Sequence, residues 1–152
     1  MGKLLVLGLL ILIFTETSQT QSQSVFLEKA KHFNNYSEDF LGFMRNGVGD
    51  DREVDEAREL ADLAAINSER LSAADTLMEI YGKLSCPEDR ERIRPVIQRD
   101  FSIYKKLFEN SVASANLSLN YTHKPAVVAE GMKMRDELRE IENLFNFNPR
   151  LE

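Results

Sequence analysis

Apolar residues recur at intervals of three and four along nearly the whole chain after residue 24, and this spacing limits the possible folds most strongly. Intervals of three and four place side chains on one face of an α-helix, whereas a strand would show alternation. In the first segment, 25–46, the stripe consists of Phe26, Ala30, Phe33, Ser37, Phe40 and Met44. Polar residues fill most other positions, so this face is expected to pack against other helices. The spacing predicts an all-α domain.

Three more segments follow, and residues that end helices separate them. The breaks are Asn46, Gly47 and Gly49, then Ser85, Cys86 and Pro87, then His123, Lys124 and Pro125. They leave helices predicted over 51–85, 86–122 and 125–146. Ser85 with Glu88 has the spacing of a capping box, as does Asp50 with Glu53, and Pro87 suits a first helical turn. Pro95 is expected to kink the third helix.

The inward stripe of the second segment is rich in alanine, which permits close approach of a neighbouring helix. The inward residues of the last three segments are Val54, Ala57, Leu60, Ala61, Ala64, Leu71, Ala74, Met78, Tyr81, Ile93, Ile97, Phe101, Tyr104, Leu107, Phe108, Val112, Ala115, Leu119, Val127, Val128, Gly131, Met134, Leu138, Ile141 and Phe145. Asn67 and Ser68 form a polar step in the middle of the second segment.

The three connections are short, and short connections make neighbouring helices antiparallel. We therefore expect an up-down-up-down antiparallel four-helix bundle with two longer central helices. Helical cytokines have up-up-down-down topology and need two long crossover loops, so a cytokine role is disfavoured.

Unequal helix lengths add a further expectation. At 1.5 Å per residue, the two middle helices should extend roughly 15 Å beyond the others. Residues 77–100, called the tip below, would then project as a two-helix hairpin. We expect contact with a protein partner or a second copy through Leu77, Ile80, Tyr81, Leu84, Cys86, Arg90, Ile93, Arg94 and Ile97. One alternative is that the charges form only surface ion pairs, such as Glu88 with Arg92. Another is that the polar stretch 18–24 or the tail, 147–152, covers the tip.

The N-terminus has the pattern of a secretory signal peptide. Lys3 precedes an apolar run of eleven residues, Leu4–Phe14, which is shorter than the ~20 residues that span a bilayer. Ser18 and Thr20 could serve as the small residues of a cleavage site. We expect a signal peptide over 1–20, a polar leader over 21–24, a helical domain over 25–146 and a tail over 147–152. The protein would be secreted or periplasmic; an uncleaved segment would instead tether it to a membrane.

Motifs for catalysis or metal binding are not found in the sequence. Its two histidines, His32 and His123, lie on separate segments, and the nearest acid–histidine spacing, Glu28 with His32, is typical of a solvent-facing pair. No HExxH, GxSxG or glycine-rich phosphate loop occurs. Cys86 is the single cysteine, so it can form no internal disulfide but could cross-link two copies. We predict a non-enzymatic protein without cofactor or metal.

The net charge and the aromatic residues bear on which partners or ligands the protein could bind. The net charge of −6 disfavours nucleic acid and anionic membranes as partners once the signal is removed. The phenylalanine stripes could line a cavity, so a carrier of a hydrophobic small molecule in the bundle core is the alternative function. Glycosylation sequons occur at Asn35, Asn116 and Asn120. The leading hypothesis is an exported helical bundle that acts through protein contact at the tip.

Overall fold

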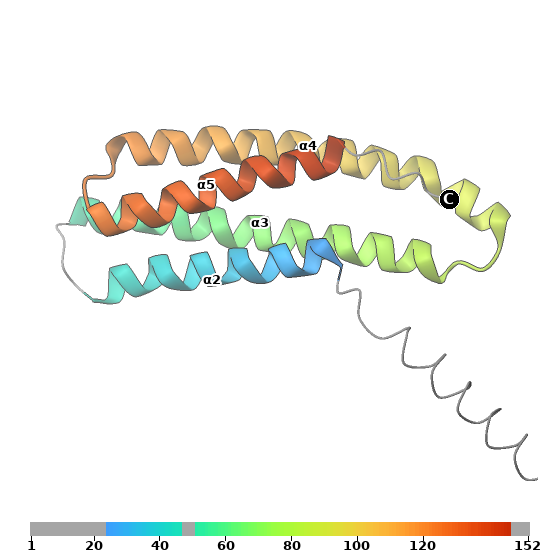
Figure 1. The fold of residues 1–152 in the computed structure, drawn as a ribbon, viewed down its shortest axis with the longest axis horizontal. Coiled ribbons are helices and arrows are strands. Elements are labelled where there is room, and N and C mark those ends of the chain that lie inside the picture. Colours follow the sequence, from blue (N-terminus) through green and yellow to red (C-terminus); the bar gives the residue numbers. More distant parts are fainter. Residues whose placement is uncertain (1–23, 47–50, 147–152) are drawn as a thin grey trace, which may run out of the picture.

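The computed structural model describes residues 24–46 and 51–146, which contain four helices and no strand. The helices are α2 (Val25–Arg45), α3 (Asp51–Lys83), α4 (Pro87–Tyr121) and α5 (Pro125–Asn146), and they lie side by side (Figure 1). The all-α prediction is confirmed for these residues, and the arrangement is consistent with a four-helix bundle. Four of the eight predicted helix ends coincide with the observed ones, and the other four differ by one or two residues. The signal peptide 1–20, the leader 21–23, Asp50 and the tail 147–152 lie outside the described residues.

Local capping explains where α2 and α4 begin. The Ser24 hydroxyl accepts a hydrogen bond from the Phe26 amide (3.2 Å) and caps α2. The predicted Ser85 cap of α4 is wrong: Cys86 is the N-cap, its side chain makes no capping bond, and Pro87 begins the helix. Proline needs no amide partner in the first turn, so α4 can start there without a side-chain cap. Pro95 lies inside α4, and the helix continues past it to Tyr121.

The predicted inward stripes form one apolar core. Phe33 and Phe40 of α2, Leu60 of α3, Phe108 of α4 and Leu138 of α5 are completely buried. Ring contacts extend across helices, and the Phe108 and Phe145 rings stack with centroids 5.4 Å apart. Burying large apolar side chains from all four helices is the main stabilising contribution expected for this fold.

Small residues set how closely the helices approach. α2 packs closely along α3, where Ala57, Ala61 and Ala64 are buried, as the alanine-rich stripe predicts. α5 packs mainly on α4. A Cβ atom on Gly131 of α5 would lie 2.7 Å from the Leu119 Cδ2 atom, closer than side chains normally approach. Gly131 therefore leaves room for the end of the Leu119 side chain where α5 meets α4.

A buried polar layer joins α3 to α4 near the middle of the bundle. Asn67 is completely buried; its amide nitrogen donates to the Leu63 carbonyl (2.8 Å), and its oxygen accepts from Arg70 (3.0 Å). Ser111 Oγ of α4 lies 3.1 Å from the same oxygen and accepts from Arg70 (3.0 Å). Burial lowers the pKa of Arg70. The polar step expected at Asn67 is thus a satisfied hydrogen-bond network, as buried polar groups require.

A second polar cluster joins α2 to α5 around Glu137, whose side chain is only 10% exposed. Glu137 Oε1 accepts from Lys29 Nζ at 2.8 Å and lies 3.1 Å from His32 Nδ1. The expectation that His32 pairs with Glu28 on its own helix is wrong, because the partner carboxylate comes from α5. Burial, together with the Glu137 charge and hydrogen bond, raises the pKa of Tyr36.

None of the four described helices is long and apolar enough to cross a membrane.

Candidate functional site

The tip, residues 77–100, is the first candidate region. α3 and α4 contain 33 and 35 residues, whereas α2 and α5 contain 21 and 22, and the two longer helices reach past the ends of the others (Figure 1). A ring cluster lies where the shorter helices stop. Phe26 near the start of α2 and Phe145 near the end of α5 contact each other and Phe101, with centroids 5.2–5.7 Å apart. From there toward the α3–α4 turn, α3 and α4 extend past α2 and α5 (Figure 1).

The tip is held together by its own small core. Tyr81 and Ile97 are 7% and 1% exposed, so these two predicted contact residues belong to the interior of the hairpin. The Arg90 guanidinium lies over the Tyr81 ring, 5.8 Å from its centroid, and Arg90 Nε donates to the Leu84 carbonyl at 2.6 Å. Arg90 therefore closes the turn that joins α3 to α4.

The tip surface combines apolar side chains with internal ion pairs. Ile80 and Val96 are exposed, while Leu77, Leu84 and Ile93 are half-buried. Arg94 pairs with Glu91 (2.9 Å), Arg99 with Asp100 (3.0 Å), and Lys83 with Glu79. Glu88 Oε2 accepts a hydrogen bond from the Cys86 thiol, with a sulfur–oxygen distance of 3.5 Å. This contact differs from the expected ion pair between Glu88 and Arg92. Several charged side chains of the tip are thus paired with each other, so the exposed apolar side chains are the groups left to contact another molecule.

Cys86 and the three sequons occupy accessible positions. Cys86 is a half-buried free thiol in the α3–α4 turn, at the far end of the tip. Asn35 of α2 and Asn120 of α4 are exposed, and Asn116 is half-buried. All three asparagines lie within helices, as the sequence predicts, although acceptors usually occupy loops.

A second candidate region, which sequence reasoning missed, lies between α3 and α4 at the opposite end from the tip. Two adjoining grooves of about 320 and 380 Å³ share Glu59, Leu117 and Ser118. We call them together the acidic groove. The remaining lining residues are Asp55, Glu56, Asp62, Leu63 and Ile66 from α3 and Ser114 and Tyr121 from α4. One helix therefore supplies mostly carboxylates and the other apolar and hydroxyl groups.

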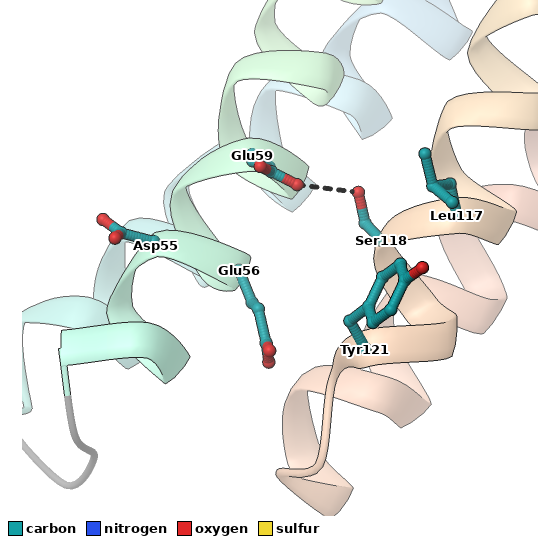
Figure 2. A pocket seen from close by; sticks show the side chains of 6 residues that line it. All are labelled: Asp55, Glu56, Glu59, Leu117, Ser118 and Tyr121. Carbon is teal, nitrogen blue, oxygen red and sulfur yellow. Dashed lines mark hydrogen bonds between the residues drawn. The ribbon is translucent and has the colours of Figure 1, made fainter.

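Figure 2 shows part of the acidic groove from close by. Ser118 of α4 donates to Glu59 of α3 across the groove, with an oxygen–oxygen distance of 3.1 Å. Leu117 and Tyr121 are 58% and 54% exposed although they are large and apolar. The signal in the sequence was the pair Leu117 and Tyr121, one helical turn apart on the face away from the inward stripe.

Among residues 24–46 and 51–146, no group of three or more His, Cys, Asp or Glu side chains is placed to hold a metal ion. The grooves are open to the surface and lined by carboxylates, hydroxyls and apolar groups, which is suited to contact with another molecule. In comparisons with known proteins, no family model, no curated protein and no solved structure matches this chain.

Proposed function

We propose that this protein is an exported, non-enzymatic helical bundle that acts through protein contact at the tip. The observation that carries the proposal is the projection of α3 and α4 beyond α2 and α5 (Figure 1). Within that projection Ile80 and Val96 are 47% and 43% exposed. A partner that covers these side chains would bury apolar area, which is favourable by about 25 cal/mol per Å².

The charge distribution favours a second copy of the chain as one such partner. Residues 77–100 contain five cations and five anions, so the net charge of −6 belongs entirely to the remainder. Two copies can therefore meet tip to tip without net repulsion, whereas their other surfaces repel each other. Cys86 in the turn would then lie near the contact and could cross-link it.

The proposal includes the up-down-up-down antiparallel topology, and pairs of contacting residues support it. From α2 to α5, Lys29 pairs with Glu140 and His32 with Glu137, so the numbers rise along one helix and fall along the other. From α3 to α4, Glu59 contacts Ser118 and Arg70 contacts Ser111 in the same opposed order.

Export is a further part of the proposal, and it rests on the sequence of residues 1–20. Expression with the natural N-terminus in a secreting host should yield a mature protein that begins near Gln21. Asn35 and Asn120 would be accessible to glycosylation in a host that modifies sequons. N-terminal sequencing that finds Met1 retained in a membrane fraction would favour a tethered form.

Sedimentation of the chain from Gln21 onward tests the contact role. We expect concentration-dependent association, and we expect Ile80→Asp with Val96→Asp to abolish it. The matched control is Met132→Asp, which changes a 45% exposed side chain on α5 and should leave association unchanged. A protein that stays monomeric, and in which the tip variant removes no bound partner, would contradict the proposal.

The alternative carrier function has less support. Phe33, Phe40 and Phe108 have no exposed surface, and Phe108 stacks on Phe145, so the aromatic stripes fill the space between the helices. Native mass spectrometry separates the two functions. A stoichiometric bound lipid would favour the carrier, and an empty protein that dimerises would favour contact.

A further inference from the structure

Exposed apolar side chains are concentrated on the outer side of the α3–α4 pair. Eight large apolar residues of the described chain are exposed, and six belong to these two helices: Ile66, Ile80, Val96, Ile103, Leu117 and Tyr121. Val96, Ile103 and Leu117 are separated by multiples of seven residues, which keeps them on one face of α4. Ile66, Leu117 and Tyr121 line the acidic groove. This face is therefore an apolar surface that neither α2 nor α5 covers.

The acidic groove adds a charge pattern to that surface. Three exposed carboxylates, from Asp55, Glu59 and Asp62, line it from the α3 side; Glu56 also belongs to the lining but is only 7% exposed. No described lysine or arginine is part of either lining. Arg58 pairs with Asp55 at 3.5 Å, but both side chains are largely exposed, so this pair is weak. The groove thus has an apolar wall on α4 and a negative wall on α3.

We propose that the acidic groove binds a cationic amphipathic helix from another protein. An apolar stripe on such a helix would cover Ile66, Leu117 and Tyr121, as in other helix-in-groove complexes. Lysine or arginine along one edge of that stripe would face the α3 carboxylates. The groove runs beside about three turns of α3, from Asp55 to Ile66, which a partner helix of 12 or more residues would match at 1.5 Å per residue.

The negative charge of the groove favours a cationic helix over two other occupants, a second copy of this chain and an anionic membrane. A second copy at the groove would bring two chains of net charge −6 together, and a two-fold axis perpendicular to the helices would also place the α3 carboxylates opposite one another, which is unfavourable. An anionic membrane surface would be repelled for the same reason. The groove is at the opposite end of α3 from the tip, so this binding goes beyond the proposed function and does not depend on it.

Titration with model peptides tests the proposal. The probe is a synthetic 18-residue helix with leucine along one face and lysine elsewhere, labelled for fluorescence anisotropy, and its control carries glutamate in place of lysine. We expect the lysine peptide to bind the chain from Gln21 onward and the glutamate peptide to bind at least tenfold more weakly. Affinity should fall as salt is raised, because the carboxylates contribute through exposed charge.

Variants locate the binding site. Glu59→Lys and Leu117→Ser should each weaken binding at least tenfold. Glu79→Lys makes the same charge change at the tip, and Met132→Ser the same kind of apolar loss on α5, and both should change affinity less than twofold. If Glu79→Lys and Glu59→Lys weaken peptide binding equally, the peptide is attracted only by the net charge of the protein, and the proposal is overturned. Equal binding of the lysine and glutamate peptides would also overturn it.

Amide hydrogen exchange provides a readout that does not depend on the variants folding normally. The lysine peptide should slow exchange in the wild-type chain within 55–66 and 114–121. Protection confined to the tip, dimer formation through the groove without peptide, or binding only to vesicles of anionic phospholipid would each contradict the assignment.

Discussion

The four-helix region and the tip are built from the same two long helices, yet they bury their apolar side chains to different extents. On the inward stripe of α4, Phe108 is completely buried, while Ile93 nearer the turn is half-buried, although Ile97 between them is 1% exposed. On α3, Leu71 is completely buried and Met78 is half-buried. The stripe is continuous in the sequence, so we attribute the difference on α3 to the extension of the two long helices past α2 and α5 (Figure 1).

This contrast shows how one stripe can serve two purposes. Where α2 and α5 flank the long pair, the stripe supplies core contacts. Past the rings of Phe26, Phe101 and Phe145, the same pattern leaves apolar surface that the described residues of α2 and α5 do not cover. Apolar surface of this kind often marks an interaction site.

The largest expected effect comes from the core of the four-helix region. Phe108→Ala should lower the free energy of unfolding by about 3–5 kcal/mol, because the cavity lies between packed rings. Ile93→Ala, on the same stripe within the tip, should lower it by clearly less. Urea denaturation followed by circular dichroism measures both. Equal losses would show that the tip is packed as well as the four-helix region.

The next effect concerns the polar link between α2 and α5, which the tip lacks. Glu137→Ala removes the carboxylate that pairs with Lys29 and His32, and should lower the unfolding free energy by about 1–3 kcal/mol. Glu140→Ala is the control, since Glu140 also contacts Lys29 but is 71% exposed. The control should cost less than about 1 kcal/mol. A larger loss from Glu140→Ala would refute the role of burial.

Tyr36 in the same cluster gives a pH dependence. Burial and Glu137 raise its pKa from the usual 10.0, so the neutral phenol is favoured in the folded state. The stabilisation is complete below pH 10 and is lost as the pH rises through the raised pKa. Thermal melts between pH 8 and about 11 should show wild type losing stability more steeply than Tyr36→Phe. Parallel curves would mean that the phenol titrates as it does in the unfolded chain.

The smallest effect is expected on the tip surface. Ile80→Ser and Val96→Ser should each change the unfolding free energy by less than about 0.5 kcal/mol, because both side chains are exposed in the isolated chain. Chemical denaturation at low protein concentration measures this without interference from association. A loss of several kcal/mol would place these residues in a core and would remove them from the contact surface.

The helices could be predicted from the sequence because their signals are local. Intervals of three and four identified the buried faces, including Phe33, Leu60 and Leu138, and glycine or proline marked the ends. The start of α4 was placed one residue early, because Ser85 was a better capping residue than Cys86 by side-chain chemistry. Pro87 made a side-chain cap unnecessary.

The candidate sites were less predictable because they depend on contacts between distant segments. The pairing of His32 with Glu137 joins residues from the first and last helices, and helix periodicity carries no information about it. The acidic groove forms only when the outward side of α3 lies beside the outward side of α4. Tyr81 and Ile97 were expected to bind a partner, but in the folded tip they pack inside it.

The buried layer of Asn67, Arg70 and Ser111 has a consequence for the length of the tip. Sliding α4 along α3 by one turn, about 5.4 Å, would carry Ser111 away from Asn67 and leave a fully buried amide short of a hydrogen bond. This layer therefore fixes the register of the two long helices. The length of the projecting hairpin therefore depends on residues inside the four-helix region. Replacing Asn67 with leucine would remove this constraint on register without altering any exposed residue of the tip.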